Sequence, residues 1–423
     1  MKAETRSNQV LAGSVHYGYV VLALIILTTF GSLGLARHGY TSVLPAMQEG
    51  LKLTNTQTGE LQSWNLLGYT ATVVFAGLLA ARFGARVVIS ISLLVTGTAL
   101  ILTGAIPTFE GARLGRCLAG VGGAGGNIPA MALVAAWFGV GRRGRAAGAA
   151  VAGSSLGLIV TGPLVPALVN RFGAEGWRIA WYVLGALAFA VFLLCALLLR
   201  DRPEPYRLAP IGESEAEAEA IAVGRGGGNP SASQAWSTIY RSGQLWHLAL
   251  VYFAFGFSYV IYSTFFIRHL AADGGFTKGE AGLLWLKVGV VSVISGFLWG
   301  SVADRWGRRL ALVSVFGLQG LAFLVFGLSR ALPLVYVSAA LFALTAWSIP
   351  ALMAALSGDL FGGRLAPAAL GLMTIVFGVG QTLGPYLAGR IADATHSFSL
   401  AFVTAGAVAL IVGGGGSLLL PRR

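Results

Sequence analysis

Ionisable side chains inside long apolar runs are the residues of this chain most able to do chemistry. Arg37 lies about 20 residues into the first run, or about 30 Å along a helix, and Lys287 lies about 8 residues into a later one. No Asp or Glu falls near the middle of any run, so neither cation has an acidic partner there. An arginine fork binds a carboxylate through two parallel hydrogen bonds, and a lysine offers a point charge. Arg37 and Lys287 are therefore predicted to bind an anionic substrate.

Each of these basic residues also has a structural interpretation. Lys287 could extend its ammonium group to the membrane surface, and Arg37 could bond helix carbonyls. A third basic residue, Arg116, lies nearer the outer end of its run and is expected to be structural. His38, next to Arg37, is a candidate for carrying a coupled proton, although the positive charge of Arg37 opposes that role.

Uncharged polar residues in the runs form a second set of candidates. Asn127 precedes Pro129, which leaves a backbone carbonyl without its helical partner. Each residue of this set could instead make a hydrogen bond between helices. The set comprises Asn65, Asn127, Tyr259, Tyr262, Trp347, Ser348 and Gln381.

The composition predicts an all-α membrane protein. Of 423 residues, 56% are hydrophobic and only 11% are charged, and the mean hydropathy is +0.76. A helix that spans hydrocarbon takes about 20 apolar residues, and such runs recur along the whole chain. This pattern excludes a soluble enzyme, a nucleic-acid module and a disulfide scaffold. No nucleophile–base pair or metal constellation is present, so we expect no enzymatic activity, cofactor or metal, and inert thiols at Cys117 and Cys195.

The apolar runs predict twelve spans in two groups of six. The first group occupies residues 1–199 and the second 245–423. The segment between them, 200–244, is acidic and rich in Gly, Pro and Ser, which is typical of a solvated linker. The spans are predicted at 17–45, 58–81, 87–106, 109–138, 145–169, 177–199, 245–270, 279–302, 310–328, 331–357, 366–392 and 398–420.

The distribution of Lys and Arg predicts the topology. Most of them fall in the tails, the linker and the loops on the same side of the membrane. The positive-inside rule therefore places both termini and the linker in the cytoplasm, with an uncleaved first span. The net charge of +13 is explained by topology and not by nucleic acid.

The two groups of spans repeat each other at an offset of 221–223 residues. GLLAARFGAR at 77–86 matches GSVADRWGRR at 300–309, and IPA at 128–130 matches IPA at 349–351. Phe-Gly and Gly-Pro pairs match in the same order. An even number of spans per repeat gives parallel halves, the arrangement of transporters with a midplane site between two bundles.

The 300–309 segment resembles the signature of the major facilitator superfamily. The first-half copy has Ala81 where that signature has an acid, which Asp304 supplies in the second half. The resemblance implies two six-helix bundles and a gate in which Asp304 pairs with Arg305 and Arg309 while the outside is open, with Arg82 and Arg86 as first-half counterparts. Further stretches, including 34–47, 63–69 and 255–266, look like YbfB-type bacterial transporters. Others, 16–23 and 127–150, look like bacterial relatives of monocarboxylate and oxalate–formate carriers.

These observations predict a secondary transporter of the bacterial inner membrane. We expect alternating access, a mono- or dicarboxylate as substrate, a proton or counter-substrate as possible coupling partner, no nucleic acid, and a monomer in the bilayer. Two alternatives stay open, namely efflux of a neutral or amphipathic compound and a transporter-like sensor that signals through the acidic linker.

Overall fold

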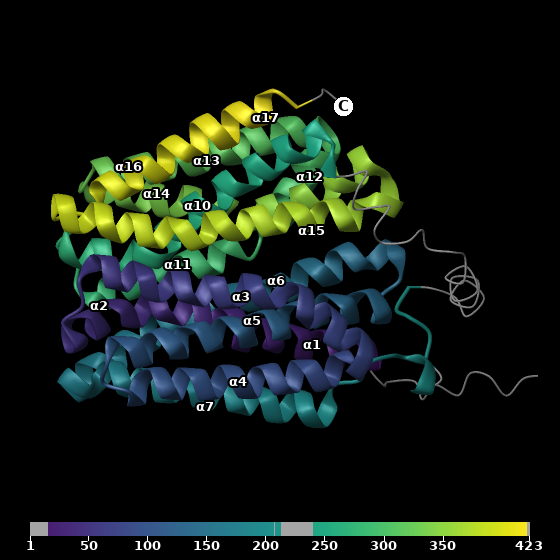
Figure 1. The fold of residues 1–423 in the computed structure, drawn as a ribbon, viewed down its shortest axis with the longest axis horizontal. Helices are drawn as coiled ribbons and strands as arrows, with labels where there is room; N and C mark the ends of the chain where they lie inside the picture. Colours follow the sequence, from purple (N-terminus) through teal and green to yellow (C-terminus); the bar gives the residue numbers. More distant parts are fainter. Residues whose placement is uncertain (1–15, 207, 213–239, 421–423) are drawn as a thin grey trace, which may run out of the picture.

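The computed structural model describes residues 16–206, 208–212 and 240–420, and the predicted linker falls largely outside them. Within the described part the chain is helical, apart from one isolated β-bridge between Phe138 and Ile211 (Figure 1). Eleven helical segments there are long and apolar enough to cross a membrane. One of them, Gly141–Leu198, contains two helices separated by a short turn, so the predicted twelve spans agree with the structure.

The N-terminal half comprises the helices before the linker. The first span is interrupted by a π-helix, η1, whose hydrogen bonds join residues five apart and not four apart as in its neighbours. The elements are α1 (Tyr17–Thr29), η1 (Phe30–His38), α2 (Gly39–Leu51), α3 (Asn55–Phe83), α4 (Ala85–Ala105), α5 (Phe109–Trp137), α6 (Val140–Phe172), η2 (Gly173–Glu175) and α7 (Gly176–Leu198). A short 3-10 turn, η3 (Glu204–Tyr206), follows.

The C-terminal half comprises the helices after the linker. Helix α15 contains two spans, because its backbone leaves the helical region at Gly362, where φ is 70° and ψ is 159°. The elements are α10 (Gly243–Ala272), α11 (Lys278–Ser292), α12 (Ser295–Trp306), α13 (Arg308–Leu328), α14 (Leu332–Thr345), α15 (Ser348–Thr395), α16 (Ser399–Val408), η4 (Ala409–Gly415) and α17 (Gly416–Leu418).

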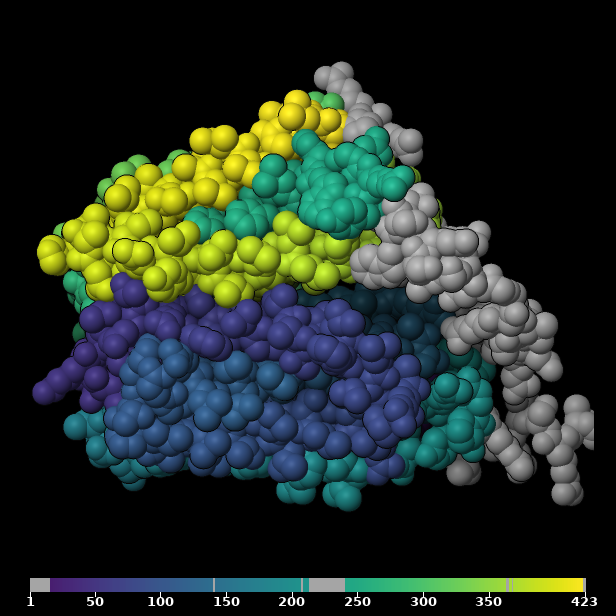
Figure 2. All heavy atoms as spheres, in the orientation of Figure 1, coloured from purple at the N-terminus to yellow at the C-terminus, as the bar shows by residue number. Residues whose placement is uncertain are grey.

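The two halves lie side by side with their helices along the long axis of the molecule (Figure 1). They contact each other through α3 against α15, α6 against α11 and α2 against α10. We call the end at which α7 ends and α10 begins the linker end, and the opposite end, with the α2–α3 turn, the far end. Polar contacts between the halves gather at the centre and at the far end. Figure 2 shows the halves touching towards the far end and parting towards the linker end, where a recess opens between them.

The repeat found in the sequence is also present in the backbone. Gly84 and Gly307, which match in the repeat, have φ and ψ of 87° and 149° and of 91° and 151°. The helices that lead to these glycines begin with the same capping box, Thr54 with Gln57 and Thr277 with Glu280. The match between the two capping boxes was not predicted from the sequence. It extends the duplication to the far end, where α3 and α11 begin.

Candidate functional site

Arg37 lies at the centre of the molecule, where η1 meets the C-terminal half. Its Nη1 donates to the Tyr259 hydroxyl at 3.1 Å and to Gln381 Oε1 at 3.3 Å. The Tyr259 hydroxyl donates to the same Gln381 oxygen at 2.7 Å. Since an arginine can only donate, the Gln381 atom facing it must be the oxygen. One guanidinium nitrogen thus ties η1 to α10 and α15.

The Arg37 guanidinium also contacts a ring of the N-terminal half. Its Cζ lies 4.9 Å from the centre of the Tyr69 ring on α3, a cation–π distance. Asn127 Nδ2 on α5 donates to the Tyr69 hydroxyl at 2.9 Å. We call Arg37, Tyr69, Asn127, Tyr259 and Gln381 the central cluster. Tyr69 was missed in the sequence, because a tyrosine in an apolar span gives no sign of which neighbour its ring covers.

The described residues provide no hydrogen-bond acceptor for the other two nitrogens of the Arg37 guanidinium. Nε and Nη2 are buried and make no hydrogen bond within the described residues. None of the ion pairs in that part of the chain involves Arg37. The N–H bonds of Nε and Nη2 point the same way, and this edge of the guanidinium can hold both oxygens of one carboxylate. A buried donor pair without acceptors is costly unless a ligand supplies them.

A second arginine braces the backbone that carries Arg37. Arg116 on α5 is fully buried and donates to the Ala36 carbonyl within η1 and to Gln62 Oε1 at 2.8 Å. Its guanidinium also lies over the Tyr40 ring, with Cζ 4.5 Å from the centre. The expectation that Arg116 is structural is in accord with these contacts.

An aromatic stack extends from the central cluster along α10 and α15. The Tyr259 and Phe255 rings are 4.5 Å apart, and Tyr252 lies 4.3 Å from Phe377 between ring centres. Their planes differ by no more than 15°, an offset-stacked arrangement. The stack is therefore a buried aromatic surface between α10 and α15 that adjoins the central cluster.

Three residues that were predicted to bind substrate lie outside the central cluster. Lys287 is exposed on α11, with its ammonium group 5.2 Å from the ring of Tyr336, which is itself exposed, so the prediction that Lys287 faces the centre is wrong. Asn65 donates to the Arg116 carbonyl at 3.0 Å and so joins two helices. Tyr262 bonds Ser338 at 2.8 Å inside the aromatic core of the C-terminal half. Asn65 and Tyr262 thus make the hydrogen bonds between helices that their structural interpretation expects.

His38 lies beside the site in a different contact between the halves. Its ring is 5.3 Å from the Trp347 ring, and Trp347 Nε1 donates to Ser155 on α6 at 3.0 Å. Ser155 also shares a 2.9 Å hydrogen bond with Ser292 on α11. The proton-coupling role of His38 stays a prediction. Ser348, another candidate, is buried and donates to the Ser295 carbonyl at 3.3 Å.

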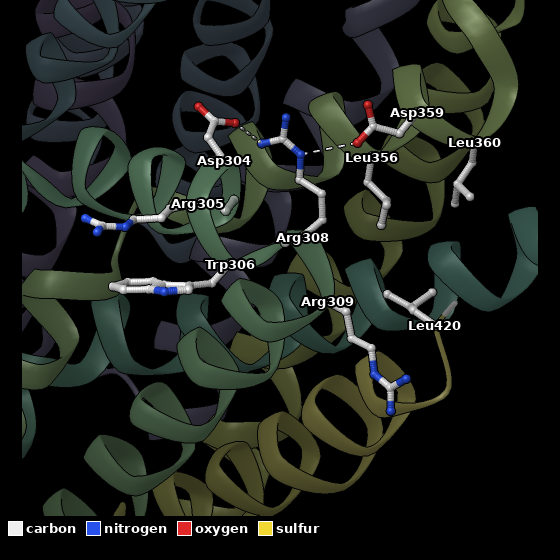
Figure 3. Close-up of a pocket in the computed structure, with 11 residues that line it drawn as sticks. Asp304, Arg305, Trp306, Arg308, Arg309, Leu356, Asp359, Leu360 and Leu420 are labelled. Atoms are coloured by element: carbon white, nitrogen blue, oxygen red, sulfur yellow. Dashed lines mark hydrogen bonds and ion pairs between the residues drawn. The ribbon is translucent and has the colours of Figure 1, made fainter. Parts of the chain in front are cut away.

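The three gating residues predicted in the second half, Asp304, Arg305 and Arg309, line a pocket of about 770 Å³ at the linker end of the C-terminal half (Figure 3). Asp304 pairs with Arg308 at 2.9 Å, and Arg308 also contacts Asp359 at 3.3 Å. Figure 3 shows Arg305 and Arg309 pointing away from both carboxylates. In this state the partner of Asp304 is thus Arg308, the first residue of α13, and not the expected Arg305 or Arg309.

The first-half counterparts differ from each other. Arg82 is exposed, with Cζ 5.2 Å from the Phe83 ring. Arg86 donates to the Ala196 carbonyl, and its backbone N–H donates to Asp201 Oδ1 at 2.7 Å. Asp201 therefore supplies, from beyond α7, a carboxylate at the beginning of α4, close to the end of α3 where Ala81 replaces the acid of the repeat.

The fold has close counterparts among solved structures. A crystal structure of a bacterial homologue of the human lysosomal transporter Spinster superposes with a TM-score of 0.73 at 18% identity, covering 96% of this chain and 97% of that one. The nucleoside transporter NupG gives a TM-score of 0.72 at 12% identity, covering 95% of this chain and 100% of that one. The helices thus form the fold of the major facilitator transporters.

Relatives in sequence are transporters as well. A probable sulfoacetate transporter of Cupriavidus necator is 28% identical, over 92% of this chain and 91% of its own length. A putative tartrate transporter of Agrobacterium vitis is 24% identical over 90% and 85%, and a hexuronate transporter of Bacillus subtilis 23% over 89% and 88%. Residues 29–416 match the family described as uncharacterised MFS-type transporter YbfB, and the chain belongs to that family. The protein is a multi-pass membrane transporter and not an enzyme.

Proposed function

We propose that this transporter carries a small organic anion, a carboxylate, by alternating access. The observation that carries the proposal is the unpartnered Nε and Nη2 edge of Arg37, buried between the two halves. Tyr259 and Gln381 anchor Nη1 and so fix the direction of that edge. The relatives named for sulfoacetate, tartrate and hexuronate support an anionic substrate.

The moving bodies in this proposal are residues 1–199 and 245–423. With basic loops and both termini in the cytoplasm, the linker end faces inward. The recess at that end and the contacts at the far end then correspond to an inward-facing state. Because Nε and Nη2 are covered in this state, the substrate reaches them as the halves rock and the Tyr69 ring moves aside.

A second candidate function is efflux of a neutral, flat amphipathic compound. The stack formed by Tyr252, Phe255, Tyr259 and Phe377 favours it, since such a surface binds rings without needing a charge. In this alternative Arg37 serves to join the halves and does not bind the cargo.

Counterflow in reconstituted vesicles separates the two functions. Wild type is tested with radiolabelled lactate, glycolate and tartrate, with an uncharged sugar, and with a flat cationic dye. Carboxylate exchange that is lost in Arg37→Gln and retained in the matched control Lys287→Gln supports the anion proposal. Exchange of the neutral or cationic probes alone would overturn it, as would equal carboxylate exchange by Arg37→Gln.

A further inference from the structure

At the far end, a carboxylate of the C-terminal half binds the beginning of a helix in the N-terminal half. Asp393 Oδ1 accepts the Asn55 N–H at 2.9 Å. Its Oδ2 accepts the Thr56 N–H at 2.8 Å and the Thr56 hydroxyl at 2.5 Å. The first N–H groups of a helix lack partners within the helix and carry partial positive charge. Asp393 on α15 thus makes a charge-assisted link to α3 across the junction of the halves.

Helix α3 does not need this carboxylate to form. The Thr54 hydroxyl accepts the Gln57 N–H at 3.1 Å, and the Gln57 side chain accepts the Thr54 N–H at 3.0 Å, which is a complete capping box. The matching helix α11 begins with the same kind of box. At an offset of 222 residues, Asp393 corresponds to Arg171, so the repeat provides no carboxylate for α11. Asp393 is therefore explained by the contact between the halves and not by helix capping alone.

The backbones of α3 and α15 lie unusually close at this end. A Cβ on Gly59 would lie 2.0 Å from the Pro385 carbonyl oxygen, and a Cβ on Gly389 would lie 2.3 Å from the Asn55 carbonyl oxygen. Glycine at both places allows the contact. Separation of the two helices at the far end would break every hydrogen bond of Asp393 to α3.

We propose that Asp393 holds the far end closed and so sets the fraction of molecules in which that end is open. Its link to Asn55 and Thr56, the far-end latch, stabilises the state with the far end closed and is absent when that end opens. This inference rests on the alternating access proposed above, but it is independent of the substrate. Weakening the latch shifts the population towards the far-end-open state before any substrate binds.

Distances between spin labels measure that shift directly. The labels are placed at positions 107 and 330, in exposed turns of the two halves at the far end, after replacement of Cys117 and Cys195 by alanine. Asp393→Asn should raise the ratio of long to short distances about tenfold, which corresponds to about 1.4 kcal/mol. Thr56→Val, which removes only the hydroxyl donor, should shift the ratio in the same direction by less.

Asp273→Asn is the matched control. Asp273 Oδ2 also accepts a backbone N–H, from Phe398 at 3.2 Å, and the Ser397 hydroxyl at 2.9 Å, but both lie within the C-terminal half. Asp273→Asn should lower the melting temperature and leave the ratio of long to short distances unchanged. A wild-type ratio in Asp393→Asn, or an equal shift in Asp273→Asn, would overturn the latch.

The same labels keep the two proposals apart. If wild type populates both distances when carboxylates are added but Asp393→Asn matches it in every condition, the latch fails and alternating access stands. If neither protein ever shows a second distance, alternating access fails and the latch fails with it.

Discussion

Replacing Arg37 by lysine tests whether the geometry of the guanidinium, and not only its charge, binds the substrate. Lysine keeps the positive charge but has no fixed pair of parallel donors. One hydrogen bond to a charged group is worth about 1.5–3 kcal/mol, and each 1.4 kcal/mol is tenfold in affinity. Losing one of the two bonds from Nε and Nη2 should weaken carboxylate binding roughly 10- to 150-fold. Arg37→Gln, which loses the charge as well, should bind more weakly still.

The assay is a thermal-shift titration of the purified protein with lactate, glycolate and tartrate. Arg37→Lys should stay folded, because the 2.7 Å hydrogen bond between Tyr259 and Gln381 does not depend on residue 37. Lys287→Arg controls for a change of cation elsewhere on the protein, since Lys287 is exposed. Equal ligand-induced stabilisation of wild type and Arg37→Lys by every carboxylate that binds would refute the assignment of the Nε and Nη2 edge as the substrate contact.

Three further perturbations follow from the contacts. Tyr69→Leu should weaken carboxylate binding more than Tyr69→Phe, because phenylalanine keeps the ring under Arg37 and loses only the hydrogen bond from Asn127; isothermal titration measures both. Asp304→Asn should change the free energy of unfolding by less than about 1 kcal/mol, since the Asp304 side chain is largely exposed. A lower turnover in vesicles would indicate that Asp304 acts in the state that is open to the outside. Burial opposes ionisation of Asp273, but hydrogen bonds from His269 and its other donors outweigh it and hold the pKa of this carboxyl below its usual value. Its contribution to stability is therefore present above the ordinary pKa and lost as the pH falls through the lowered one, so the melting temperature of wild type should fall more than that of Asp273→Asn on acidification below about pH 4.

The spans and the duplication could be predicted because they depend on local and repeated features. A run of apolar residues must be helical in a bilayer, since no water satisfies its backbone groups. The repeat further indicated that Tyr259 corresponds to Arg37, and in the structure these two side chains are hydrogen-bonded across the halves. Asn127 and Gln381 were identified as polar residues in apolar surroundings, and both lie in the central cluster.

The direction in which a side chain points could not be predicted in the same way. Lys287 lies in a helix that is apolar on all sides, so the sequence carries no periodicity that distinguishes the lipid face from the central face. Asn65 and Tyr262 have the same ambiguity, because a polar group inside a membrane helix can bond a neighbouring helix or a substrate. The choice of Arg308 as the partner of Asp304 depends on the angle between α12 and α13, which the residue types do not determine.

The direction of Arg37 depends on the π-helix at residues 30–38. Each residue of an α-helix turns the chain by about 100°, whereas the hydrogen bonds of a π-helix join residues i and i+5, so each residue turns the chain by less. The difference accumulates over the residues of η1 that precede Arg37, and the same residues wound as a regular α-helix would point Arg37 in another direction relative to α1, away from Tyr259. A change of helix type within one span can therefore remove the positive charge from the centre while every span of the fold is kept.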